Sequence, residues 1–582
     1  KTSKPGFGSI DQKVFERSQE NLYQYDVATN VSLHKFFPET WALSLPFYVD
    51  FSEIYIMPQY DLTNPDVLLQ KSLDNLSSQQ QRDSLLNLSL DYTQRMSYNF
   101  TNVKINKQVK KQTPFNINNF STSYAYSRFL SHDIDYNKNY SEQYKAAFNY
   151  NYSKQPKNFQ PFKKNKVKII KDFNFFLLPN AITIQNEWDR TYKEQQRRNL
   201  SAFTELPTTS SKLFKWNRNY TVNYALSKAL KVSYSASNQA RIKEPYGVIN
   251  KTDEQIWQEY KSEVWRSIQS FGENTQFSQK WNLTYQLPFD KIKYFDWLTA
   301  SYKYTGTYDW MIGSELPTTS NINFGNNIKN SNNNGIDGTI NMTKLYTKSK
   351  YLTEVSKRVR NFNSQTKKKE TVKYNQDNVK ISSKVPFEIN HKLKTEDVKV
   401  TIMDASGQIV SGTSKIISPS KIEYVCNQDV ENAKIVVTGK RDVVETPFTK
   451  ARDYTINTLM MTRTITINYN QSEGTYIPGY TYNSQYFGLH NPFQADATAP
   501  GWAYVMGLIP ANVDALDFND WLVTNNDLIS EKYKRTFTNQ IRVQASLEPV
   551  KNMRITLNSD RSYSNNYSQY LLGDSEINKN NR

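Results

Sequence analysis

The side chains that most often do chemistry in proteins are sparse in this sequence. It holds one cysteine and four histidines, namely Cys426, His34, His132, His391 and His490. The histidines show no metal-ligand spacing, and no histidine lies near Cys426 in the sequence to activate its thiol. Because Cys426 alternates with Tyr424 and Ile422 along a short aliphatic strand, we expect a buried structural thiol.

The acidic pair Asp253–Glu254 is the nearest approach to paired catalytic carboxylates. Both residues belong to a capping-box pattern that opens a helix, where acids complement the helix dipole. The sequence shows no nucleophile elbow, phosphate loop or zinc-binding helix motif. We therefore predict no catalytic, cofactor-binding or metal-binding residues, no cofactor, and no enzyme activity.

The clearest pattern is instead an alternation of side-chain types between residues 216 and 238. A strand has a side-chain period of two, so this alternation predicts a β-hairpin with two unlike faces. The apolar face would carry Tyr220, Val222, Tyr224, Leu226, Leu230, Val232 and Tyr234. The polar face would carry Asn219, Thr221, Asn223, Lys231, Ser233 and Ser235.

The composition extends this pattern to the whole chain. Only 37% of the 582 residues are hydrophobic, yet aromatics make up 14%, which argues against disorder. The mean hydropathy is -0.73. No apolar run reaches the roughly 18 residues of a membrane helix, which leaves a membrane β-barrel open. About fifteen segments alternate as strands should.

The net charge of +18 has to be placed on some surface. We expect it on solvated loops and polar inward faces, with anionic lipid headgroups as an alternative partner. Nucleic-acid binding would require a focused basic patch within a recognisable module, which the sequence lacks. We predict no nucleic-acid partner.

Connections between the predicted strands alternate between short turns, such as 177–180 and 225–230, and long loops. Outer-membrane barrels sort their connections in this way. Trp188, Trp216 and Trp310 lie at long-loop ends, and Trp297 lies near a short-turn end. We predict that these four are membrane-interface aromatics, that the apolar hairpin face meets lipid and that the polar face lines a watery lumen. Filling of a soluble core by the aromatics is the alternative.

The chain divides into four predicted parts. Barrel strands with long loops and helices occupy 1–340, a helix and polar linker 341–384, a small soluble β-domain 385–447, and further barrel strands 448–582. Helical patterns interrupt the strands after residue 64, after residue 252 and at 342–359. The chain lacks a signal-peptide pattern and a closing strand, so we expect it to be an internal piece of a longer polypeptide.

Several long strings together resemble one family, the SprA or Sov outer-membrane translocon of the Bacteroidetes type IX secretion system. They are GFGSIDQKVFERSQE (6–20), YNFTNVKINK (98–107), PFKKNKVKIIKDFNFFLLPNAITIQNEWDR (161–190), FKWNRNYTVNYALSKALKVSYSAS (214–237), IKEPYG (242–247), FDWLTASYKYTGTYDW (295–310) and APGWAYVMG (499–507). The resemblance covers most of the chain and is weakest across the inserted domain and residues 325–380.

The resemblance implies a fold and a function. The fold would be a segment of a very large antiparallel transmembrane β-barrel with long extracellular loops, a few loop helices and the inserted β-domain. It would sit in the cell outer membrane and pass folded cargo proteins through a polar lumen with a lateral opening. Implied partners are a PorV-type barrel, a plug protein, secreted cargo with a C-terminal signal domain, and outer-membrane lipid; a role in gliding motility is also implied.

Two other functions fit parts of the pattern. Another outer-membrane barrel, of the TonB-dependent or lipopolysaccharide-assembly type, would share the alternation and the loop asymmetry. A secreted multi-domain β-protein that binds glycan would instead show hydrophobic cores on both sheet faces or regular domain-length repeats. The sequence shows neither of these features.

Overall fold

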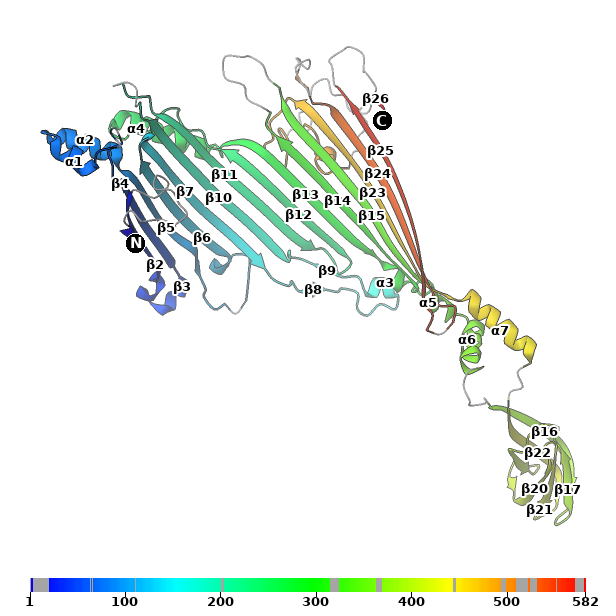
Figure 1. Ribbon diagram of the computed structural model, residues 1–582. Helices are drawn as coiled ribbons and strands as arrows, with labels where there is room; N and C mark the ends of the chain where they lie inside the picture. The colour runs from blue at the N-terminus through cyan, green and yellow to red at the C-terminus, as the bar shows by residue number, and fades with distance from the viewer. Residues whose placement is uncertain are drawn as a thin grey trace. The chain divides into compact units, whose positions relative to one another are not determined.

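The computed structural model describes residues 2–3, 20–62, 64, 66–109, 111–199, 204–313, 324–362, 369–442, 446–493, 499–508, 522–523, 531–550, 552–570 and 580–581. The chain forms two compact units (Figure 1). The first, called the sheet unit, comprises Lys1–Gly338, Asn468–Arg542 and Asp560–Arg582. The second unit comprises Thr339–Ile467 and Val543–Ser559.

One large antiparallel sheet dominates the fold, and it contains 17 strands. Strands next to one another in the sequence pair almost throughout, as an up-and-down meander does (Figure 1). The first strands are β1 (Thr2–Ser3), β2 (Glu20–Ser32), β3 (Leu43–Ser44), β4 (Pro46–Pro58), β5 (Asp91–Ile105), β6 (Phe120–His132), β7 (Tyr136–Ser153) and β10 (Ala181–Arg197). The others are β11 (Thr209–Ala225), β12 (Leu230–Arg241), β13 (Glu273–Leu287), β14 (Leu298–Met311), β15 (Asn326–Asn341), β23 (Thr462–Tyr480), β24 (Tyr533–Leu547), β25 (Ile555–Gln569) and β26 (Asn580–Asn581).

The prediction of a mostly β chain with a large antiparallel sheet is confirmed. In the described part of the chain the sheet is not closed, since β1 pairs only with β2 and β26 only with β25. Most of the long strands have 12 to 19 residues, for example β12 with 12 and β23 with 19. That exceeds the roughly 9–11 residues needed to cross a bilayer, so these strands would extend beyond it.

The position of the inserted segment differs from the expectation. We predicted a long loop from Trp310 onward, but β15 occupies Asn326–Asn341 and pairs with β23. β15 runs in the same direction as β11 and β13, because neighbouring strands are antiparallel. It therefore ends at the edge where the short turn 226–229 and the connection 288–297 lie. The inserted segment leaves the sheet at this edge, not within one of the long loops at the opposite edge.

Residues 177–180 do not form the tight turn between two neighbouring strands that we predicted. The connection between β7 and β10 holds only two short paired strands, β8 (Asn158–Phe159) and β9 (Phe175–Phe176), and the short helix α3 (Lys168–Lys171). The buried Asn174 side chain explains this local structure. Its Oδ1 accepts hydrogen bonds from the Asn158 amide and from the Lys228 backbone N–H, which fixes the connection beneath the β11–β12 turn.

The helices form close to the predicted sites. The first helical pattern is split into α1 (Leu69–Asn75) and α2 (Gln79–Ser89), starting later than expected. α4 (Glu254–Gln269) is capped by Asp253, whose carboxylate accepts from two backbone N–H groups. The remaining helices are α5 (Met342–Tyr346), α6 (Lys350–Phe362), α7 (Pro447–Leu459) and α8 (Trp502–Val505). None of the helices in the described part of the chain is long and apolar enough to cross a membrane.

The second unit contains the small β-domain, which has its own core. Its two sheets are formed by β16 (Lys369–Ile381), β22 (Val430–Asp442), β18 (Val398–Met403) and β19 (Ile409–Val410), and by β17 (Pro386–Asn390), β21 (Lys421–Cys426) and β20 (Gly412–Ser418). The domain begins at β16, earlier than the expected residue 385, because the polar strand β16 pairs along β22. Cys426 is fully buried in the core, as predicted.

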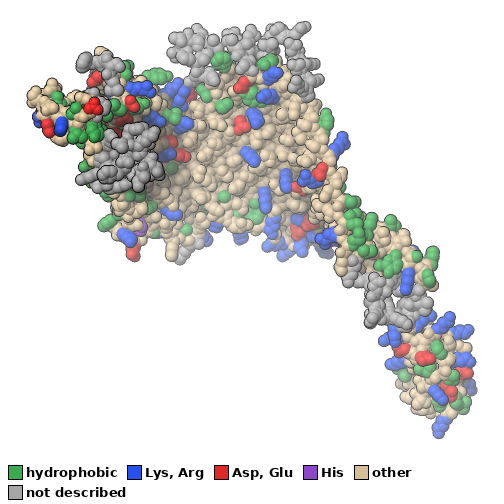
Figure 2. All heavy atoms as spheres, in the orientation of Figure 1, with side chains coloured by type: hydrophobic (Ala, Val, Ile, Leu, Met, Phe, Trp, Pro, Cys, Tyr) green, Lys and Arg blue, Asp and Glu red, His purple; other side chains and the backbone are tan. Residues whose placement is uncertain are grey.

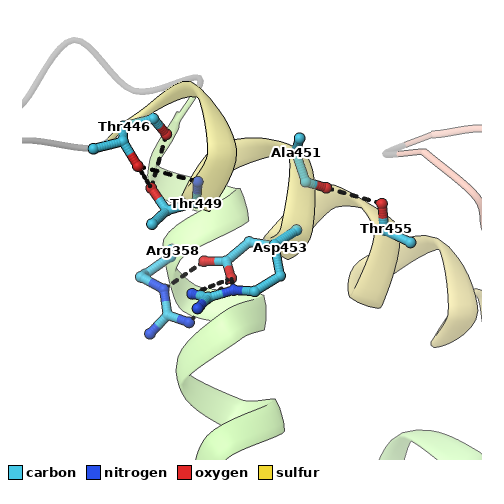
Figure 3. Close-up of polar contacts among 7 residues, drawn as sticks. Arg358, Thr446, Thr449, Ala451, Asp453 and Thr455 are labelled. Atoms are coloured by element: carbon cyan, nitrogen blue, oxygen red, sulfur yellow. Dashed lines mark hydrogen bonds and ion pairs between the residues drawn. The ribbon is translucent and has the colours of Figure 1, made fainter.

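The helices α6 and α7 of the second unit are joined by a buried carboxylate (Figure 3). Asp453 of α7 has no exposed surface, and Arg358 of α6 donates to it with Nε 2.6 Å from Oδ2. Arg452 donates to the same carboxylate at 2.9 Å. The hydrogen bond from Arg358 holds the pKa of Asp453 below its usual range. Because two arginines compensate the buried charge, the pair fixes the packing of α6 against α7.

Candidate functional site: a two-faced sheet and its loop cover

The hairpin of β11 and β12 has the predicted two faces. In its register Val222 lies opposite Tyr234, and Thr221 lies opposite Ser235. Residues directly opposite one another share a face, so the apolar and the polar sets are each continuous across the hairpin. The turn covers residues 226–229, which places Leu226 outside the strands. Ser227 Oγ accepts the N–H groups of Ala229 and Leu230 and closes this turn.

The apolar face continues across the neighbouring strands as cross-strand aromatic pairs. Trp188 of β10 lies opposite Trp216 of β11, with ring centroids 5.2 Å apart. Other directly opposed pairs on this face are Phe47–Phe100, Tyr55–Tyr92, Tyr98–Tyr126, Tyr126–Tyr144, Phe120–Tyr150 and Tyr234–Trp281. Such pairs contribute about 0.2–1 kcal/mol each, and together they fix the register in which all apolar side chains share one face.

The opposite face consists of short polar side chains. Ser233 Oγ donates to Asn223 Oδ1 at 2.8 Å, and Thr305 Oγ1 donates to Asn282 Oδ1 at 3.0 Å. Cationic side chains, among them Lys231 and Lys280, are spaced between them. The face turned toward the viewer in Figure 2 likewise shows mainly uncharged polar groups and backbone with isolated charges. Whether lipid meets the apolar face and water the polar face stays a prediction.

The four predicted interface tryptophans have different surroundings. Trp310 has no exposed surface, and its indole Nε1 donates to the Tyr482 carbonyl at 3.1 Å. Trp216 is also buried, stacked on Phe271 with centroids 5.7 Å apart. Both rings therefore contact protein in this structure, unlike a ring in a lipid headgroup layer. Trp297 donates to the Tyr294 carbonyl in the short connection before β14. That the four rings lie at a membrane interface stays a prediction.

A long connection after β23 covers part of the apolar face. We call its described residues, 481–493 and 499–508, the returning loop. Tyr504 and Val505 of this loop are buried in one aromatic cluster with Tyr308 and Trp310 of β14. The loop approaches β14 very closely at Gly306, where an added Cβ would lie 2.0 Å from the Met506 carbonyl oxygen. Only glycine allows this approach.

Side-chain amides of the strands bind the backbone of the returning loop. Asn326 donates to the Tyr482 carbonyl at 3.0 Å, Asn332 to the Gly507 carbonyl at 2.7 Å, and Gln279 to the Val505 carbonyl at 2.9 Å. Asn274 and Asn330 make similar bonds to Ser484 and Tyr504. These bonds satisfy loop carbonyls that docking removes from water. The polar strand β15 therefore supplies the hydrogen-bond donors that the docked loop needs.

A second cover is held by charge. Arg190 of β10 pairs with Glu244, which precedes α4, with Nε 2.9 Å from Oε1. Tyr260 of α4 accepts from Arg190 at 2.9 Å and donates to Glu244. Burial raises the pKa of the Tyr260 phenol well above its ordinary value, and the hydrogen bond to Glu244 adds to this. The phenol thus stays protonated and able to donate.

Sequence reasoning missed both covers. Their residues lie far apart in the chain and form no motif. A partial signal existed, since Glu244 lies in IKEPYG and Tyr504 in APGWAYVMG, two strings that carry the family resemblance. Among the described residues, no group of three or more His, Cys, Asp or Glu side chains could hold a metal ion.

The fold and faces define the class as a large antiparallel sheet protein with one polar and one apolar face. Residues 1–73 match the SprA_N family, described as a motility related/secretion protein. The chain thus carries a SprA_N domain at residues 1–73, which confirms the predicted resemblance there. Among curated proteins, none shows significant sequence similarity to the chain.

Two solved structures show distant likeness. The siderophore receptor PirA from Acinetobacter baumannii has 7% identity and a TM-score of 0.22, covering 98% of this chain and 73% of that chain. The copper transporter OprC has 5% identity and a TM-score of 0.18, covering 95% and 72%. At these TM-scores neither likeness bears on fold or function.

Proposed function

We propose that this SprA-family chain forms part of a very large outer-membrane β-barrel that passes folded cargo proteins to the cell surface. The observation that supports the proposal is the register of β10 to β14. It keeps short polar side chains together on one face and most aromatic and aliphatic side chains on the other, where Arg190 and Arg218 are exceptions. A barrel wall between lipid and a watery lumen requires this division along every strand.

The polar face suits passage of a folded protein. Its hydroxyl and amide side chains are short and bond to one another, as Ser233 does to Asn223. A passenger would therefore meet few apolar side chains to which it could adhere. In this proposal Asn219, Thr221, Asn223, Lys231, Ser233 and Ser235 line the lumen, and Tyr220, Val222, Tyr224, Leu230, Val232 and Tyr234 lie on the lipid side.

The partners in this proposal come from the family resemblance. A PorV-type barrel would collect the C-terminal signal domain of the cargo at a lateral opening, and a plug protein would close the periplasmic end. Gliding motility would depend on the same export route. If the short-turn edge is periplasmic, the β-domain that follows β15 would be connected to the sheet on that side.

Cysteine labelling of two adjacent residues tests the proposal. In a Cys426→Ser background, Thr221→Cys and Val222→Cys place thiols on opposite faces of β11. With the whole protein in outer-membrane vesicles, we expect a water-soluble, membrane-impermeant maleimide to label position 221 and not 222. A lipid-soluble maleimide should show the reverse preference. Equal labelling of both positions by the water-soluble reagent would contradict a barrel wall at this hairpin.

A further inference from the structure

A cavity of about 750 Å³ lies on the apolar face of β10 to β13, between two loop segments. Its floor is apolar, formed by Ile182, Ile184 and Val222 of β10 and β11. Phe271, in the turn between α4 and β13, and Phe487 of the returning loop form part of its rim. The volume and the apolar lining are those of a small-molecule site.

A buried cation without an anionic partner lies in this cavity wall. Arg218 is only 8% exposed. Its Nη2 donates to Asn274 Oδ1 at 2.9 Å, and its guanidinium lies 4.8 Å from the centroid of the Trp216 ring. Its Nε is buried and lacks a hydrogen-bond partner, and no ion pair involves this guanidinium among the described residues. A buried charge in this state is unfavourable unless an anion compensates it.

A second polar group at the same site is also incomplete. Asn238 lies directly opposite Arg218 in the register and is 8% exposed. Its Oδ1 is buried and has no donor. Arg218 therefore offers a donor and Asn238 an acceptor at the same place in the cavity. An anionic group with a neighbouring hydroxyl would satisfy both.

We propose that this cavity binds one anionic lipid, with its phosphate or carboxylate on Arg218 and its acyl chain on the apolar floor. The apolar floor supports a lipid over a free anion, because the apolar side chains continue from Val222 to Tyr224 of β11 and Val232 of β12 on the same face of the sheet. The proposal rests on the proposed function, in which that face meets the membrane. It assigns to the hairpin a specific lipid site within an otherwise general lipid surface.

Tryptophan quenching provides the test, since Trp216 lies beside Arg218. The whole chain, purified in a nonionic detergent, is titrated with 9,10-dibromostearate and with brominated phosphatidylglycerol or phosphatidylcholine. We expect saturable quenching by the two anionic probes and at least about tenfold weaker binding of the zwitterionic one. Trp216→Phe should remove most of the saturable quenching. If the stearate binds and the phosphatidylglycerol does not, the ligand is a free fatty acid. If the phosphatidylglycerol binds and the stearate does not, the ligand is an anionic phospholipid.

Variants decide whether Arg218 carries the affinity. Arg218→Gln should weaken the binding of both anionic probes about tenfold, while Arg218→Lys should retain much of it. Ala236→Leu, which fills the cavity and leaves the cation intact, should also weaken binding. Arg128→Gln, an arginine on the same face outside the cavity, is the matched control. Circular dichroism reports whether each variant is folded.

Three results would overturn the proposal: equal quenching by the zwitterionic lipid, unchanged binding in both Arg218→Gln and Ala236→Leu, or displacement of the stearate by inorganic phosphate alone at similar concentration. The last would indicate an anion site without a lipid. The assay needs no bilayer, so its failure leaves the 221/222 labelling result standing. Conversely, equal labelling at 221 and 222 would contradict the barrel wall without removing the cavity.

Discussion

Arg190 of β10 and Glu244 of the connection before α4 form a two-bond ion pair at 2.9 Å and 3.0 Å. The Glu244 side chain is 3% exposed, so the pair is shielded from water and from salt. Tyr260 of α4 bonds to both partners. The pair thereby ties the long β12–β13 connection, with its helix, to the wall of the sheet.

Glu244→Ala should release that connection. The substitution leaves the Arg190 charge without an anion in a dry site, which costs about 3–5 kcal/mol. We expect faster hydrogen exchange across α4, residues 254–269, and little change in β11 and β12. Glu273→Ala is the matched control, because its partner Arg241 is 40% exposed and such pairs contribute at most about 1 kcal/mol. Equal effects of the two variants would contradict a shielded pair.

Val222 and Thr221 are neighbours on opposite faces of β11. If Val222 faces lipid near the bilayer midplane, Val222→Arg should reduce the free energy of folding into the membrane by about 2–4 kcal/mol. Thr221→Arg should cost much less, because its side chain would extend into water. Urea-driven unfolding from phospholipid vesicles measures both. Similar costs for the two variants would count against the proposed faces.

Gly306 sets the distance between β14 and the returning loop. Gly306→Ala places a methyl group 2.0 Å from the Met506 carbonyl oxygen. Because the clash is with backbone and not with a flexible side chain, a side-chain rotation cannot relieve it. We expect the loop to leave its seat, exposing residues 499–508 to limited proteolysis. Gly335→Ala in β15 is the control, since its added methyl would be 3.6 Å from its nearest neighbour. Protection of 499–508 in both variants would contradict this role for Gly306.

His391 gives the β-domain a predictable pH dependence. It is 1% exposed, and its Nδ1 accepts the Leu393 N–H, so burial lowers its pKa. As the pH falls through about 6.5, the unfolded state binds a proton before the folded state does. The free energy of unfolding should therefore decrease with acid below that pH, by about 1.4 kcal/mol per unit of pKa depression.

The measurement is denaturant unfolding of a fragment comprising residues 369–442 at pH 7.5 and 5.5. The buried core shared by its two sheets is the reason to expect this fragment to fold alone. His391→Asn keeps an acceptor for the Leu393 N–H and cannot titrate, so it should abolish most of the difference. A difference that persists unchanged in this variant would show that other groups cause it.

The sequence predicted the elements whose pattern is local. The β11–β12 hairpin could be predicted because Val222 and Thr221 differ in type where the strand period requires it. α4 could be predicted because a capping-box pattern at 252–255 precedes apolar residues at helical spacing, although Asp253 proved to be the N-cap. β15 was missed because its sequence, NNIKNSNNNGIDGTIN, is rich in asparagine and glycine, which strands usually avoid. Asn326, Asn330 and Asn332 bond to the returning loop, and these contacts are visible only in the fold.

The candidate site also combines features that local sequence predicts with features that it does not. The two faces follow from side-chain alternation, whereas the burial of Trp310 and Trp216 depends on loops more distant in the chain. Asn326 and Tyr482 bond across 156 positions of sequence. No local preference encodes such a contact, so the burial of Trp216 and Trp310 by protein could not be predicted from the sequence.

The meander has a consequence for how the protein could be assembled. From β4 to β14 each long strand pairs with the long strand that precedes it, so each can be added as soon as it emerges from the chain. β23 is different, because its partner β15 precedes the whole segment 342–461. An independently folded β-domain would shorten the flexible part of that segment and lower the entropy lost when its ends meet. The β-domain would then help the chain to resume its sheet, whatever else it binds.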